Sequence, residues 1–88
     1  MAWITVWDFR DEDGDIVRIV SSGYSRLVPI LHQPVTLAVP MPPNAVVNVV
    51  GVKDGYGGIT LGVSSEAMSV QLPVLAEGQI IGVPVLAR

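Results

Sequence analysis

Short runs rich in β-branched residues recur along the whole chain at intervals of about 8–12 residues, separated by turns that contain glycine or proline. The most β-prone run, 45–52, carries valines that would fill both faces of an extended strand. Nowhere do apolar residues recur at the i, i+3, i+4, i+7 spacing of an amphipathic helix. We therefore predict an all-β fold, an antiparallel β-sandwich of Ig-like or jelly-roll-like type, with roughly seven to eight short strands and essentially no helix.

The opening segment shows strand alternation most clearly. Trp3 and Trp7 lie on alternate positions from the aliphatic residues between them, so an extended strand places both indoles on one face. Asp13-Gly14 then supplies a residue pair that readily adopts positive φ in a tight turn. A second run, 16–21, follows this turn. We predict that the two strands form a hairpin.

Further strands are expected after this hairpin. Pro29 lies within one of them, and because proline has no N–H to donate to a ladder, that strand should lie at a sheet edge or contain a bulge. The run that follows the glycine-rich turn at 54–58 should pair with the valine-rich run before it. The expected strands are 25–31, 35–39, 45–52, 59–63, 68–75 and 79–86.

The chain has little charge with which to solvate its surface. Its 88 residues suffice for one domain spanning 1–88, and 50% are hydrophobic while 15% are charged, against a usual charged share of about 25%. We expect identical subunits to cover the surplus apolar surface in a homo-oligomer or a larger structural assembly. The alternative is a small sandwich whose faces are simply aliphatic. The candidate interface residues are Trp3, Trp7, Val47 and Val49.

Composition and segment patterns argue against several kinds of partner. The net charge of −3 and the scattered basic residues do not suit a nucleic-acid backbone. Cysteine is absent, which rules out disulfides and thiolate chemistry. Residues 27–52 carry no formal charge, but their prolines exclude a membrane-spanning helix. The N-terminus has no basic segment followed by an apolar run, so we expect no signal peptide.

An acidic cluster follows the first strand. A turn could bring the carboxylates of Asp11, Asp13 and Asp15 together on a hard cation such as Ca²⁺, the only cofactor that the sequence suggests. The spacing departs from an EF-hand loop, because glycine is fourth instead of sixth and Ser22 stands at the twelfth position. In the competing interpretation the cluster builds a turn, and Asp15 or Asp8 accepts backbone N–H bonds.

The tryptophans allow two roles, whereas catalysis has little support. If their face is exposed, the flat rings suit the C–H face of a carbohydrate; otherwise Trp3 and Trp7 pack in the core or in a subunit interface. The only histidine, His32, lies in a proline-containing connection with no carboxylate nearby in the sequence. We therefore expect no enzymatic activity.

Two segments resemble known proteins. The Val-Trp-Asp strand end at 6–8, followed by Glu-Asp-Gly-Asp at 12–15, resembles small β-sandwich domains with that signature from secreted and surface-associated bacterial proteins. The run 50–62, with its Gly-Gly-Ile-Thr motif, is similar to small phage or environmental proteins. The resemblance covers 3–20 and elsewhere only the strand rhythm, and it implies a sandwich more strongly than a role.

These observations predict a structural protein. The expected role is a homo-oligomeric subunit of a phage virion, such as a capsid decoration protein, or of an extracellular surface. The alternative is a small module that binds Ca²⁺ or carbohydrate. We expect neither a nucleic-acid partner nor a membrane span.

Overall fold

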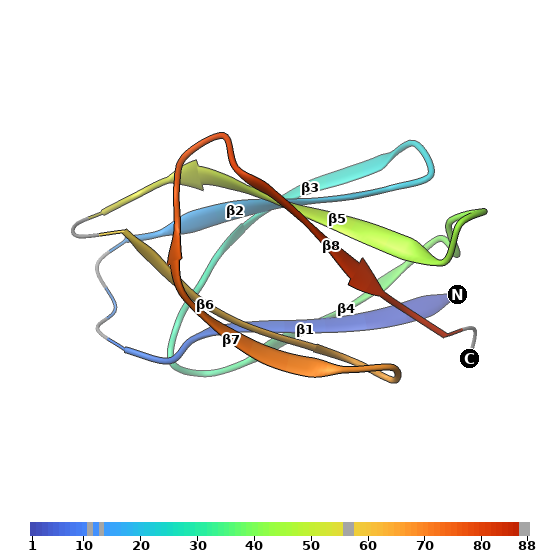
Figure 1. Cartoon of the computed structure of the whole chain (residues 1–88), viewed down its shortest axis with the longest axis horizontal. Helices are drawn as coiled ribbons and strands as arrows, with labels where there is room; N and C mark the ends of the chain where they lie inside the picture. Colours follow the sequence, from blue (N-terminus) through green and yellow to red (C-terminus); the bar gives the residue numbers. More distant parts are fainter. Residues whose placement is uncertain (11, 13, 56–57, 87–88) are drawn as a thin grey trace.

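Eight β-strands and no helix make up the described part of the chain (Figure 1). The computed structural model describes residues 1–10, 12, 14–55 and 58–86. No helix among them has the length and apolarity to cross a bilayer. The all-β prediction is confirmed. The strands are β1 (Ala2–Asp8), β2 (Ile16–Ser21), β3 (Tyr24–Pro29), β4 (Val35–Val39), β5 (Val46–Lys53), β6 (Ile59–Ser65), β7 (Ser69–Leu75) and β8 (Ile80–Pro84).

The strands form two four-stranded antiparallel sheets that stack face to face. Sheet A has the order β4-β1-β6-β7, and sheet B has the order β3-β2-β5-β8. Among these strands, β2–β3 and β6–β7 are consecutive pairs within one sheet, while every other connection crosses between the sheets. The predicted antiparallel β-sandwich is therefore confirmed. The chain passes repeatedly from one sheet to the other (Figure 1).

Two predicted hairpins are wrong. β1 pairs with β4 and β6 in sheet A, whereas β2 pairs with β3 and β5 in sheet B. β5 and β6 likewise belong to different sheets. Alternation identifies the side chains that face the core, but every strand of a sandwich has such a set, so the pattern does not identify the neighbouring strand.

The core lies between the sheets and consists of the inward half of each alternation. Ile4, Val17, Val47, Leu61 and Val83 come from five different strands, and each is 0% exposed. Burial of an aliphatic side chain of this size contributes about 1.5–3 kcal/mol. The outward residues of each strand do not take part in this packing. The two sheets carry different side chains on their outer faces.

Prolines lie on the edge strands of both sheets. Pro29 lies in β3, Pro73 in β7 and Pro84 in β8, and all three strands are edges. The prediction that Pro29 lies at an edge is confirmed. In β7 the register also shifts, because Ile59 pairs with Leu75 but Leu61 pairs with Leu72, which is a β-bulge. Prolines and bulges make an edge a poor template for a further strand.

Candidate binding surfaces

The described acidic residues of the loops at one end of the sandwich bind backbone amides. This end is where β1, β3, β5 and β7 finish (Figure 1). The pairs, acceptor first, are Asp8 with Arg10, Glu12 with His32, Asp15 with Gly55, Asp54 with Gly58, and Glu77 with Asp54. Loop amides have no ladder partner, so a carboxylate that accepts from them stabilises the loop. The prediction that Asp15 or Asp8 accepts backbone N–H bonds is confirmed for both.

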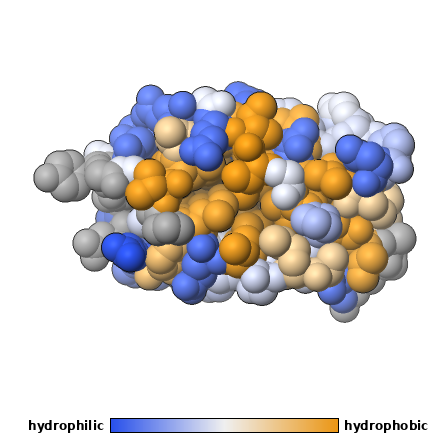
Figure 2. Space-filling model, viewed as in Figure 1, coloured by the Kyte–Doolittle hydropathy of each residue, from blue (hydrophilic) through white to orange (hydrophobic). Residues whose placement is uncertain are grey.

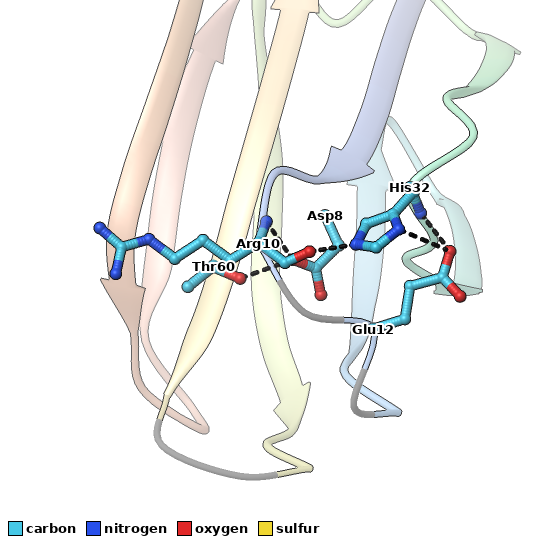
Figure 3. Close-up of polar contacts among 5 residues, drawn as sticks. All are labelled: Asp8, Arg10, Glu12, His32 and Thr60. Atoms are coloured by element: carbon cyan, nitrogen blue, oxygen red, sulfur yellow. Dashed lines mark hydrogen bonds and ion pairs between the residues drawn. The ribbon is translucent and has the colours of Figure 1, made fainter.

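Asp8 joins two strands of sheet A at this end. Its side chain is 1% exposed, and its Oδ1 accepts a bond from the Arg10 N–H at 2.9 Å and another from the Thr60 hydroxyl at 2.6 Å (Figure 3). The buried Oδ2 has no hydrogen-bond partner among the described residues. Because bonds to an ionised acceptor are about twice as strong as neutral ones, Asp8 holds the end of β1 firmly against β6.

The fold places the carboxylate of Glu12 beside His32, although the two residues are 20 positions apart in the sequence. The backbone N–H of His32 donates to Glu12 Oε1 at 2.5 Å, and Nδ1 of its ring lies 3.7 Å from the same oxygen (Figure 3). The ring Nε2 contacts the carbonyl oxygen of Arg10. The two side chains are 60% and 43% exposed. The ring nitrogens thus face a carboxylate and a carbonyl, neither of which is a nucleophile that the imidazole could activate.

Of the three carboxylates proposed for Ca²⁺, the structure describes that of Asp15. Asp11 and Asp13 lie outside the described residues. Asp15 is 0% exposed, and its Oδ1 accepts a bond from the Gly55 N–H at 2.8 Å. The described part of the chain contains no group of three His, Cys, Asp or Glu side chains placed to hold a metal ion. The contact with Gly55 ties the segment before β2 to the segment after β5.

Both tryptophans project from the outer face of sheet A. Trp3 is 37% exposed, and Trp7 is half-buried because its indole lies on Gly62 of β6. Of the predicted roles, burial in the core is therefore excluded for both indoles. We use the name tryptophan face for the outward residues of this sheet. They are Trp3, Thr5 and Trp7 of β1, Thr36 and Ala38 of β4, Thr60, Gly62 and Ser64 of β6, and Ser69 and Gln71 of β7.

A second surface lies where the two sheets end side by side. β7 and β8 are edge strands of different sheets along one side of the molecule, and hydrophobic residues gather across that side (Figures 1 and 2). We use the name seam for five residues of these strands. They are Val70, Leu72 and Ile81, which pack against the core but are only partly buried, and Val74 and Ile80, which are 62% and 60% exposed. Ile80 pairs with Val50 and therefore borders the seam from the outer face of sheet B.

The remaining candidate interface residues lie elsewhere. Val47 and Val49 are 0% exposed and belong to the core between the sheets. The expectation that these two valines contact a partner is therefore wrong. Only the residues that alternate with them along β5 point outward. They include Val46 and Val50, both partly exposed, on the outer face of sheet B.

Neither the seam nor the amide-binding role of Glu12 and Glu77 was predicted from the sequence. Leu72 and Ile81 have the same alternation as fully buried residues, so only the strand order reveals that they lie at an edge. The usable signal was the proline within each of these strands, since a proline inside a strand indicates an edge.

A scan against protein-family models found no match, and searches of curated proteins and of solved structures found none either. The function proposed below therefore rests on the surfaces of this chain.

Proposed function

We propose that the chain is a non-enzymatic structural subunit that assembles with identical copies through the seam. The observation that carries the proposal is the incomplete burial of Val70, Leu72 and Ile81, core-facing residues of the two edge strands β7 and β8, whose strands also expose Val74 and Ile80 at 62% and 60%. Apolar residues that gather on one side of a small protein, as they do here (Figure 2), mark interaction surfaces. A second copy that covers these residues also shields the open side of the core between β7 and β8 from solvent.

The chain is so small that a single interface would cover a substantial share of its surface. Its accessible surface is 4673 Å². A standard interface removes about 800 Å² from each partner, about one sixth of that surface. An isologous contact, in which the same patch meets itself, hides the seam of both copies at once and closes the assembly. We propose a homo-oligomer of this kind as the basic unit of a larger structure.

Side chains, and not added strands, would form this contact. Pro73 and Pro84 lie in the two strands that border the seam, and β7 contains a bulge. A proline cannot donate to a neighbouring ladder, so continuous strand pairing between copies is disfavoured. Packing of aliphatic side chains across the seam remains, which resembles the interior of a domain more than an extended sheet.

Two further parts of the proposal have weaker support. A non-enzymatic role is in keeping with His32, which is 60% exposed and whose ring nitrogens contact the Glu12 carboxylate and the Arg10 carbonyl. A location on a virion or an extracellular surface is supported by the resemblance of 50–62 to small phage proteins. Neither part is needed for assembly through the seam.

Light scattering coupled to size-exclusion chromatography tests the assembly. We expect the wild-type chain to elute as an oligomer at micromolar concentration and the variant Ile80→Lys to elute as a monomer, because a lysine cannot be buried without a partner charge. Val74→Lys should act in the same way. The control is Leu31→Lys, which places the same charge on a 46% exposed residue outside the seam and should leave the oligomer intact.

The outcomes separate the alternatives. A wild-type chain that stays monomeric at micromolar concentration contradicts the proposal. An oligomer that survives both seam substitutions shows that another surface makes the contact. Circular dichroism of each variant establishes that a change of mass comes from the interface and not from unfolding.

A further inference from the structure

The Trp7 indole presents one ring face to the sheet. A Cβ built on Gly62 would lie 2.2 Å from Cε2 of the ring, 2.5 Å from Nε1 and 2.6 Å from Cζ2. If the ring met the sheet with its edge, Nε1 and Cζ2 would be nearer to that point than Cε2, which lies between them. Cε2 is nearest, so the ring lies flat on Gly62. Its other face is directed away from the sheet.

One cross-strand neighbour of each indole is small. Trp3 pairs across the sheet with Ala38, as Trp7 does with Gly62. The two tryptophans are four residues apart on one strand, a separation of about 13 Å at the usual rise of 3.3 Å per residue. The tryptophan face therefore carries two aromatic positions on a line, spaced more widely than the length of a single sugar ring.

A row of hydroxyl groups crosses the sheet between these positions. Thr5 lies between the tryptophans on β1 and pairs with Thr36 on one side and Ser64 on the other, and Ser64 pairs with Ser69. The Thr5 and Thr36 hydroxyl oxygens lie 2.9 Å apart on the exposed surface. Adjacent strands are about 4.8 Å apart, so the row places one hydroxyl residue per strand across all four strands. Each hydroxyl can donate and accept a hydrogen bond.

The tryptophan face has the chemistry of a carbohydrate platform and not that of the seam. None of its outward residues is charged, and its polar side-chain groups are hydroxyls, the two indole N–H groups and the Gln71 amide. An aliphatic partner surface would leave those groups without hydrogen bonds, which is costly. We propose that the tryptophan face binds a neutral, extended oligosaccharide, with pyranose rings stacked on Trp3 and Trp7 and sugar hydroxyls bonded to the row at Thr5.

Calorimetry with defined oligosaccharides tests this site. The probes are cellohexaose, mannohexaose and xylohexaose, with oligogalacturonate of the same length as the charged comparison. We expect at least one neutral hexamer to bind, and the acidic one to bind more weakly because a neutral face offers no cation to its carboxylates. Trp3→Ala and Trp7→Ala should each weaken binding about tenfold, which corresponds to about 1.4 kcal/mol for a well-placed aromatic contact.

Matched controls keep the result independent of folding and of the seam. Trp7→Phe retains a ring on Gly62 and should keep most of the affinity, and Leu27→Ala changes an exposed residue of sheet B and should keep all of it. Absence of binding by folded wild-type protein to every neutral hexamer overturns the proposal. So does a tryptophan variant that loses the oligomer, since the face would then be a contact between copies. Ile80→Lys should still bind sugar, so failure at the seam and failure at this face are distinguishable.

Discussion

The tryptophan face and the seam are both surfaces with exposed apolar groups, yet they differ in what a partner would have to satisfy. The tryptophan face sets its two indoles among hydroxyl residues on a continuous sheet. The seam lies between two edge strands of different sheets and contains only valine, leucine and isoleucine. The side chains of the seam therefore need no hydrogen bonds from a partner, whereas a partner on the tryptophan face must replace the hydrogen bonds that its side chains make with water.

The contrast between the two surfaces shows where function resides in a small sandwich. The inward residues of all strands form one shared core of similar aliphatic side chains. Such side chains can replace one another at modest cost if the volume is kept. Chemical identity lies in the outward half and at the edges, where packing imposes no requirement. Self-association and ligand binding can then coexist in one domain, because they use surfaces that share no residue.

The largest expected effect comes from breaking the support of the seam at Gly51. A Cβ there would lie 2.4 Å from the backbone oxygen of Ala76, in the loop that joins β7 to β8. That loop is held by bonds from Gly78 N–H to the Gly51 carbonyl at 2.7 Å and from Gly51 N–H to the Gln79 carbonyl at 3.0 Å. Because a backbone atom cannot swing aside, Gly51→Ala should lower the free energy of unfolding by about 3 kcal/mol, measured by urea titration.

The matched control is Gly78→Ala, in the same loop. Gly78 has open space around a Cβ but a φ of +82°, so its substitution strains the backbone without a clash. The cost should be about 1 kcal/mol. If Gly51→Ala costs no more than Gly78→Ala, the close approach of the loop to β5 is incorrect.

The next effect concerns Asp8, which anchors the strand that bears the tryptophans. Asp8→Ala removes the acceptor of the Arg10 N–H and of the Thr60 hydroxyl and should lower the free energy of unfolding by about 2 kcal/mol. Thr60→Val removes one of these bonds with little change of shape and should cost about 1 kcal/mol. Urea titration of both variants checks the ratio. Equal costs would mean that the Arg10 bond contributes nothing.

Most of the fold could be predicted from the sequence because strands are a local property. The expected run 45–52 corresponds to β5, and 35–39 corresponds to β4 with the same bounds. Strand pairing is not local, and it was wrong for β1 with β2 and for β5 with β6. The turn residues between these strands favour a change of direction, but they do not determine whether the chain returns to the same sheet or crosses to the other.

The surfaces could be predicted only in part, for the same reason. The shared face of Trp3 and Trp7 follows from alternation within one strand. The row from Thr36 through Thr5 to Ser64 requires the register of β1 with two neighbours, and nothing in the sequence specifies it. Val47 shows the opposite failure, since a valine-rich strand reveals that both of its faces are apolar but not which face meets the core.

A smaller effect is expected where the tryptophan face depends on Gly62. In Gly62→Ala the new Cβ would displace the Trp7 indole, which, unlike the Ala76 backbone, can rotate away. The clash is partly offset, because alanine in a strand loses about 0.5–1 kcal/mol less entropy on folding than glycine does. We expect a net loss of about 1 kcal/mol in the free energy of unfolding, together with a red shift of the tryptophan emission as the ring becomes more exposed. Unchanged emission would show that the indole does not lie flat on this strand.

The smallest effect tests whether the hydroxyl row is a free surface. Thr36→Val removes one hydroxyl of the exposed pair with Thr5, and an exposed bond between neutral groups contributes little. We expect a change within about 0.5 kcal/mol, since valine is also a good strand former. A double-mutant cycle with Thr5→Val should give a coupling energy of similar size when the chain is monomeric, as in Ile80→Lys. A coupling that grows on assembly would place the row inside a subunit contact, and then the tryptophan face and the seam would no longer be separate surfaces.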